Sequence, residues 1–208
     1  MTEHPPNNAL IVFCKNRIEV EVKTRLASDI GPKASLEVYK QLQEQTFLQI
    51  PFHLFDVHVF YHRYIENSLP EYDHRITEKH IQHGKDLGEK MKNAFAKIND
   101  YQKYRTRLII GTDCPFIHEG IFEEAIEYLS HVDYVIGPAL DGGYYLFGTK
   151  ELDESIFENM PWSTDQLLST TIEKLHAKDK KVHLLTSLPD IDTLEDLQRY
   201  WSKYYMER

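Results

Sequence analysis

The 208-residue sequence is poor in several features that would each indicate a class of protein. It has only two cysteines, Cys14 and Cys114, which lie far apart in the chain. This does not suggest a disulfide-stapled secreted fold, so we expect reduced thiols in the cytoplasm. No apolar run approaches the roughly 18 residues that a membrane-spanning helix needs. The N-terminal residues also lack the basic and apolar segments of a signal peptide.

Positive charge is also scarce. Lysine and arginine together number 24 against 33 aspartates and glutamates, which gives a formal net charge of -9. Proteins that bind a phosphate backbone normally carry a basic surface, so DNA or RNA is not an expected partner. An acidic chain can still bind a phosphorylated small molecule, provided that it has a local basic cluster or holds a divalent cation.

The apolar residues that are present form short runs separated by amphipathic segments. Continuous runs such as Leu-Ile-Val-Phe are typical of strands that are covered on both faces. Strands are predicted at residues 9–15, 55–62, 107–113, 133–139, 144–148 and 181–186, with a weaker candidate for an edge strand at 75–82. Helices are predicted at residues 33–49, 85–99 and 118–130, after a capping box at 163–166, and from about residue 193 onwards.

This alternation of strands and helices predicts one α/β domain with a mixed, mainly parallel sheet and helices on both faces. The segment from Val135 to Gly148 is an exception. Only Leu-Asp-Gly-Gly separates its two strands. Such a linker is too short for a parallel crossover and predicts an antiparallel return.

In open α/β sheets, ligands bind outside the carboxyl ends of the strands. Asp113 follows the strand Leu-Ile-Ile-Gly, where a carboxylate is suited to holding Mg²⁺ or Mn²⁺ against a diphosphate. An equally simple interpretation is that Asp113 caps or turns the chain.

The segment from Lys15 to Arg25 follows the first strand and is the most basic stretch of the chain. Lys15, Lys23 and Arg25 are suited to phosphate recognition. The segment contains no glycine, so it is neither a P-loop nor a dinucleotide-binding fingerprint. The alternative is a solvated loop in which Glu19 and Glu21 balance the basic charge.

Two further acidic segments follow predicted strands. In Asp141-Gly142-Gly143, the glycines permit close approach of a ligand, and Asp141 is suited to act as a base, although a simple hairpin turn also explains the pattern. Asp190 and Asp192 lie two residues apart in an extended segment, so both side chains point to one side. They are candidate metal ligands, while capping of the following helix alone would explain one of them.

The histidines cluster early in the chain, and none has a spacing that convincingly predicts a metal site. This group comprises His53, His58, His62, His74, His80 and His83. We interpret them as surface or core residues.

Taken together, the segments resemble a bacterial family assigned as glycosyltransferases (DUF2064-like), often found beside radical-SAM and selenium-related genes. This family is a branch of the nucleotide-diphospho-sugar transferase superfamily. The matching segments, in order, are Phe13-Cys14-Lys15, Val22 to Leu26, Leu87 to Met91, Ile110 to Pro115, Gly137 to Leu146, Pro161 to Asp165 and Asp190 to Leu197. They extend over nearly the whole chain.

The resemblance implies a GT-A-like three-layer α/β/α sandwich with about seven strands, and a nucleotide site at the carboxyl ends of its first half. It implies a nucleotide-sugar or nucleotide ligand, a small-molecule acceptor, and Mg²⁺ or Mn²⁺. Diphosphate would be held by Lys15, Lys23 and Arg25, and the metal by Asp113 with Asp192 or Asp190. The sugar or acceptor would face Asp141, Gly142, Gly143, Tyr144 and Trp162.

In one respect the sequence departs from the family. The first loop of the family carries proline and glycine at the positions of Arg17 and Val20. Either this loop folds differently, with Arg17 replacing backbone donors, or nucleotide binding is weakened. Three hypotheses therefore stand: glycosyl transfer from a nucleotide-diphosphate sugar, nucleotidyl transfer with release of pyrophosphate, and a degenerate, non-catalytic binding domain.

Overall fold

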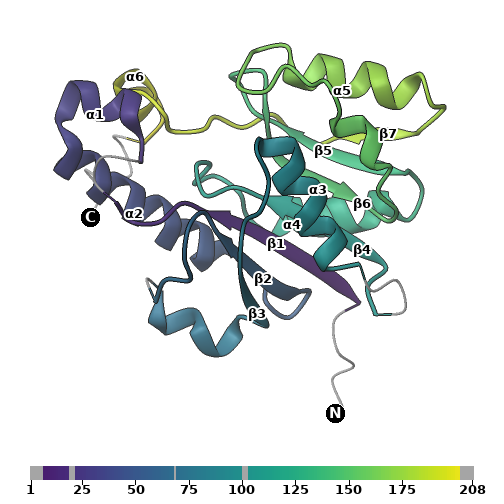
Figure 1. Cartoon of the computed structure of the whole chain (residues 1–208), viewed down its shortest axis with the longest axis horizontal. Coiled ribbons are helices and arrows are strands. Elements are labelled where there is room, and N and C mark those ends of the chain that lie inside the picture. The colour runs from purple at the N-terminus through teal and green to yellow at the C-terminus, as the bar shows by residue number, and fades with distance from the viewer. Residues whose placement is uncertain (1–6, 19–21, 68, 100–102, 202–208) are drawn as a thin grey trace.

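The computed structural model describes residues 7–18, 22–67, 69–99 and 103–201. Its seven-stranded sheet has the order β3-β2-β1-β4-β6-β5-β7 (Figure 1). The strands are β1 (Asn8–Cys14), β2 (Asp56–Tyr61), β3 (Glu78–Ile81), β4 (Thr106–Ile110), β5 (Tyr134–Pro138), β6 (Tyr144–Thr149) and β7 (Val182–Leu184). Only β6 is antiparallel to its neighbours, β4 and β5. The predicted mixed, mainly parallel sheet is confirmed, including the antiparallel return and the edge strand β3.

Helices cover both faces of the sheet, which confirms the three-layer α/β/α architecture. The helices are α1 (Thr24–Ile30), α2 (Pro32–Gln49), α3 (Leu87–Lys97), α4 (Glu119–Leu129), α5 (Leu167–His176) and the single turn α6 (Leu194–Asp196), which continues as a π-helix at Leu197–Trp201. Two short 3₁₀ segments lie at Pro70–Arg75 and Glu154–Phe157. Helices α2 and α4 pack on one face, and α3 and α5 pack on the other.

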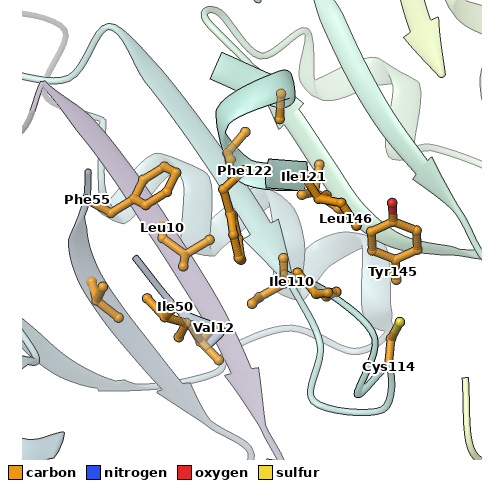
Figure 2. Packing of buried hydrophobic residues seen from close by; sticks show 14 of the residues in the cluster. Leu10, Val12, Ile50, Phe55, Ile110, Cys114, Ile121, Phe122, Tyr145 and Leu146 are labelled. Carbon is orange, nitrogen blue, oxygen red and sulfur yellow. The ribbon is translucent and has the colours of Figure 1, made fainter. Parts of the chain in front are cut away.

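The core follows from the continuous apolar strands. On the first face, Ile121 and Phe122 of α4 lie over Leu10 of β1 and Ile110 of β4 (Figure 2). All four side chains are at most 4% exposed. On the opposite face, Phe95 of α3 packs among side chains of the same strands. Because helices cover both faces, the loops at the carboxyl ends of the strands are where a ligand can reach the sheet.

Several local predictions need correction. The capping box predicted at Ser163 is wrong: α5 begins only at Leu167, its N-cap Gln166 makes no side-chain cap, and Ser163 has a positive φ of 63°. Helix α1 was not predicted, because its seven residues are too few to show a clear stripe. The strand predicted at residues 107–113 also extends too far, since β4 stops at Ile110 and leaves Gly111 to Asp113 as a loop.

Among the residues that the structure describes, no helix combines the length and apolar character needed to cross a bilayer. The helix predicted from about residue 193 onwards is described only as far as residue 201, and Val20 in the first loop also lies outside the described residues.

Candidate active site

The strand order places a crevice between β1 and β4. The chain runs from β1 outward to β2 and β3, then returns to the other side of β1 as β4. The carboxyl ends of β1 and β4 therefore carry loops that diverge, and ligands bind at such switch points. A cleft of about 800 Å³ opens there. The predicted residues that line it are Lys15, Lys23, Arg25, Asp113, Asp141, Gly143, Tyr144, Asp190 and Asp192.

Lys23 lies at the centre of this cleft. It is the N-cap of α1 in a left-handed conformation with φ 49°, and its carbonyl accepts hydrogen bonds from the Ala27 amide at 2.7 Å and the Ser35 hydroxyl at 3.1 Å. Its side chain is only 2% exposed, and its ammonium lies 2.6 Å from Asp113 Oδ1 and 3.9 Å from Asp192 Oδ1. The folded chain thus holds a buried cation between two carboxylates.

This cation determines the state of Asp113. The partial desolvation of Asp113 in the cleft would by itself raise its pKa, but the positive charges of Lys23 and Lys15 outweigh it and lower that pKa below its ordinary value. Asp113 is therefore an anion at neutral pH.

The segment 190–192 is tied to the Asp113 loop. The Ile191 amide donates to the Asp113 carbonyl at 2.9 Å. Capping of α6 is carried out by Thr193 and Asp196, which form a capping box. The Asp192 carboxylate therefore does not cap the helix, and it faces Lys23 and the largely exposed Arg25, whose guanidinium lies 3.3 Å away.

The backbone of Lys15 is fixed by a side chain that sequence reasoning missed, Tyr39 of α2. The Lys15 amide donates to the Tyr39 hydroxyl at 2.7 Å, and that hydroxyl donates to the Lys15 carbonyl at 3.0 Å. Burial raises the pKa of Tyr39 well above its ordinary value, so the hydroxyl stays protonated. The end of β1 is thereby anchored to α2.

Arg17 does not replace phosphate donors in the structure. Its Nε donates to Gln43 Oε1 at 2.7 Å, and its guanidinium lies 3.6 Å from Glu44 on the same helix. Arg17 is not among the residues lining the cleft. Arg17 is thus turned onto α2, and the basic residues of this segment that line the cleft are Lys15, Lys23 and Arg25.

Asp190 is the carboxyl group of the cleft with the most perturbed acidity. Burial, and then the negative charge of Asp141, raise its pKa to about 6. The surrounding cations therefore do not fully offset the cost of ionising Asp190 in the folded protein.

We expect Asp190→Asn to stabilise the protein above about pH 6 and much less at pH 4. Because the folded-state pKa of about 6 lies above the ordinary 3.8, the free energy of unfolding falls as pH rises from 3.8 to about 6 and stays at the lower value above that. Removing the carboxyl should raise the free energy of unfolding by about 2 kcal/mol at pH 8 and by less than about 1 kcal/mol at pH 4. Urea denaturation at both pH values measures this. The control is the exposed Asp179→Asn, and an equal gain at both pH values would contradict the assignment.

The β5–β6 hairpin brings Asp141 to the cleft. The Gly143 amide donates to Asp141 Oδ1 at 2.8 Å, and Gly142 adopts φ 91°. A Cβ at Gly142 would meet the Asp165 carbonyl oxygen at 2.3 Å, so this glycine allows the approach of backbone rather than of a ligand. The motif therefore forms a tight hairpin turn and also places Asp141, the candidate base, at the cleft.

Trp162 and Gly142 are the two predicted site residues that do not line the cleft. Trp162 packs against Gly88 at the start of α3, where an added Cβ would meet the indole ring at 2.5 Å, and against Phe157. Tyr144 does line the cleft, with its hydroxyl 4.0 Å from the Met91 sulfur.

Comparison with known proteins identifies the family and supports the fold. Residues 49–164, more than half of the chain, match the family DUF2064, described as an uncharacterized protein conserved in bacteria. The chain belongs to this family. No match was found among curated proteins.

Solved structures share the fold of this DUF2064 protein. A candidate nucleotide-diphospho-sugar transferase from Desulfovibrio desulfuricans G20 is 28% identical with a TM-score of 0.83, over 98% of this chain and 91% of that one. A 4-diphosphocytidyl-2C-methyl-D-erythritol synthase from Anaerococcus prevotii DSM 20548 is 15% identical with a TM-score of 0.63, over 98% and 97%. A manganese complex of Rv0371c from Mycobacterium tuberculosis H37Rv is 12% identical with a TM-score of 0.54, over 94% and 98%.

Sequence reasoning also missed one wall of the cleft of this DUF2064 protein. His62, Gln82 and Lys90 line it, and the Lys90 ammonium lies 3.3 Å from His62 Nδ1. Burial and the charge of Lys90 lower the pKa of His62, so its neutral ring accepts from that ammonium. His62 directly follows β2, so the rule that selected Asp113 could also have selected His62.

The carboxylates of the cleft suit a hard divalent cation that is also bound by substrate phosphates. Carboxylate oxygens are ligands that Mg²⁺ prefers, and Mg²⁺ is commonly held by one or two carboxylates together with substrate phosphates. Asp113 and Asp192 already share one cation, the Lys23 ammonium. Within the described part of the chain, the cleft acids do not form a group of three with mutually close ligand atoms. The donors fit an ion that arrives with a diphosphate better than one bound alone.

Proposed function

We propose that this protein transfers a sugar from a nucleotide-diphosphate donor to a small-molecule acceptor, with Mg²⁺ or Mn²⁺. The observation that carries the proposal is the buried Lys23 ammonium, 2.6 Å from Asp113 at the switch point between β1 and β4. It places a fixed positive charge and a fixed carboxylate where the diphosphate of a nucleotide sugar would lie. The likeness to a candidate nucleotide-diphospho-sugar transferase supports it.

Each side chain then has a definite task. Lys15, Lys23 and Arg25 bind the diphosphate oxygens, and the 72% exposed Arg25 side chain would exchange its contact with Asp192 for the phosphate. A divalent ion held by Asp113 with Asp190 or Asp192 would neutralise negative charge on the leaving diphosphate. The sugar and acceptor lie toward Asp141, Gly143 and Tyr144, and Asp141 accepts the proton of the acceptor hydroxyl.

Nucleotidyl transfer is the second candidate, in which a nucleoside triphosphate and a phosphorylated small molecule give an activated product and pyrophosphate. It is favoured by the likeness to a synthase of a diphosphocytidyl compound over nearly the whole chain. The same cations would hold a triphosphate equally well. The glycine-free loop between Lys15 and Lys23 argues against it, because few backbone donors can approach the phosphates there.

A thermal-shift titration separates these candidates. Nucleotides and nucleotide sugars are titrated with and without Mn²⁺ against the wild type, Lys15→Met and Asp192→Asn, with Lys40→Met on α2 as the control. We expect a Mn²⁺-dependent shift with one nucleotide sugar, weakened at least tenfold in affinity in the two cleft variants and unchanged in the control. Pyrophosphate release from a triphosphate and a sugar phosphate would instead support nucleotidyl transfer. No response to any nucleotide would contradict both.

A further inference from the structure

A second cluster of potential ligands lies away from the cleft, on the edge strands β2 and β3. His58 of β2 is directly beside Glu78 of β3 in the parallel register, and His80 follows Glu78 by two residues. Side chains two apart on a strand point to the same face. The three residues therefore gather on one face of the sheet, and their ligand atoms lie within 4.8 Å of one another. In the described part of the chain, no other group of three or more such residues has ligand atoms this close.

Each of the two buried histidines has one ring nitrogen that makes no hydrogen bond with the described residues. His58 is 4% exposed and His80 is 8% exposed. Among the described residues, neither His58 Nδ1 nor His80 Nε2 has a hydrogen-bond partner. Buried polar atoms are seldom left unsatisfied, and an unoccupied ion site is one accepted reason for an exception.

The surroundings also fix which nitrogen of His58 is available. The Tyr104 hydroxyl donates to Asp56 Oδ2 at 2.9 Å, so its oxygen accepts from His58 Nε2 at 3.2 Å. The proton of neutral His58 therefore sits on Nε2, and Nδ1 presents its lone pair. A histidine held by a chain of hydrogen bonds to a carboxylate is the usual arrangement around a metal ligand.

The spacing suits a small tetrahedral ion. Zn²⁺ binds histidine nitrogen and carboxylate oxygen at about 2.1 Å, which places adjacent ligand atoms about 3.4 Å apart. His80 Nε2 and Glu78 Oε2 are 3.4 Å apart. Since the Glu78 side chain is 59% exposed, it can adjust toward His58 and leaves access for a water as fourth ligand.

We propose that His58, Glu78 and His80 form a second metal site, which takes a borderline divalent ion of the Zn²⁺ class through two imidazoles and one carboxylate. Imidazole with carboxylate selects such ions over Mg²⁺, which prefers oxygen alone. Glu78 and Asp56 favour the cation electrostatically, while Lys97 and Lys103 oppose it. The ion would cross-link β2 to the edge strand β3. The interpretation of His58 and His80 as surface or core residues agrees with the structure, which buries both, and the proposal adds a metal to these buried side chains.

The test uses the untagged full chain, stripped with a chelator and titrated with Zn²⁺ alone against a chromophoric competitor. We expect one equivalent to bind, and binding to weaken at least tenfold in Glu78→Gln and His80→Gln. His53→Gln is the matched control, because His53 lies the same 3.4 Å from Glu119 but belongs to no such group of three. Substitution with Co²⁺ should give the visible spectrum of a tetrahedral site in the wild type and lose it in Glu78→Gln.

Two results would overturn the proposal. One is the absence of Zn²⁺ binding by the wild type. The other is Zn²⁺ binding that survives Glu78→Gln unchanged, which would place the ion at a site other than His58, Glu78 and His80. Because Glu78 is exposed, this variant should fold even where His80→Gln does not, as circular dichroism will establish. No nucleotide enters the experiment, so its outcome is independent of the function proposed for the cleft.

Discussion

Replacing Asp113 by asparagine should lower the free energy of unfolding by about 3 kcal/mol, because it leaves a charged lysine buried without its close partner. The Lys23 side chain is 2% exposed, and its remaining carboxylate, Asp192, is 3.9 Å away. Lys23→Met should cost less, about 1 to 2 kcal/mol, since the Asp113 side chain is 44% exposed and water can screen its charge. The double variant should be more stable than Asp113→Asn alone.

Urea denaturation of the four proteins at pH 7 forms a double-mutant cycle that isolates this pair. The matched control is the surface pair Lys40–Glu37, which has almost the same separation, 2.7 Å, but is exposed. Its cycle should give a coupling energy below about 0.5 kcal/mol. If Lys23 and Asp113 coupled no more strongly than Lys40 and Glu37, the pair would not be the electrostatic centre of the cleft.

Gly142→Ala should destabilise the protein by about 3 kcal/mol. Alanine at φ 91° carries backbone strain of about 1 to 2 kcal/mol. Its Cβ would also lie 2.3 Å from the Asp165 carbonyl oxygen, a backbone atom that cannot rotate away. The Gly142 carbonyl accepts the Leu168 amide at 2.9 Å, so the hairpin is pinned to α5 and cannot shift freely.

The control for this substitution is Gly111→Ala, also at the cleft. Gly111 has nothing within 4 Å of an added Cβ and no positive φ, so its free energy of unfolding should change by less than about 1 kcal/mol. Equal denaturation midpoints for the two variants would contradict the assigned strain. A shift of the hairpin should also displace Asp141, so Gly142→Ala should weaken any sugar-dependent binding more than nucleotide binding.

Much of the site could be predicted because it follows from strand direction. Asp113, Lys15 and Asp141 each follow a strand whose continuous apolar run marks its direction and end. Once a parallel sheet is predicted, those ends meet at one edge. The pairing of Lys23 with Asp113 could not be predicted in this way. It depends on the position of α1, and only one of the seven residues of that helix, Leu26, is buried.

Other features depend on contacts that are distant in sequence. The direction of Arg17 depends on Gln43 and Glu44 across the packed helix α2. Trp162 was expected to face the sugar or acceptor, yet its indole ring packs against Gly88. The cluster of His58, Glu78 and His80 appears only through the register of two strands, because their spacing along the chain matches no metal motif.

The antiparallel strand β6 has a consequence for how the chain folds. Its ladder with β5 pairs Pro138 with Tyr144, so this hairpin closes a very short loop. By contrast, pairing of β1 with β4 joins Asn8 to Thr106, and contacts so distant in sequence form slowly. We therefore expect the hairpin with Asp141 to form early, whereas Lys15 and Asp113 are brought together only by the late ladder. The cleft is then among the last parts of the molecule to be assembled, and until then the chain lacks the surface on which we propose that the nucleotide binds.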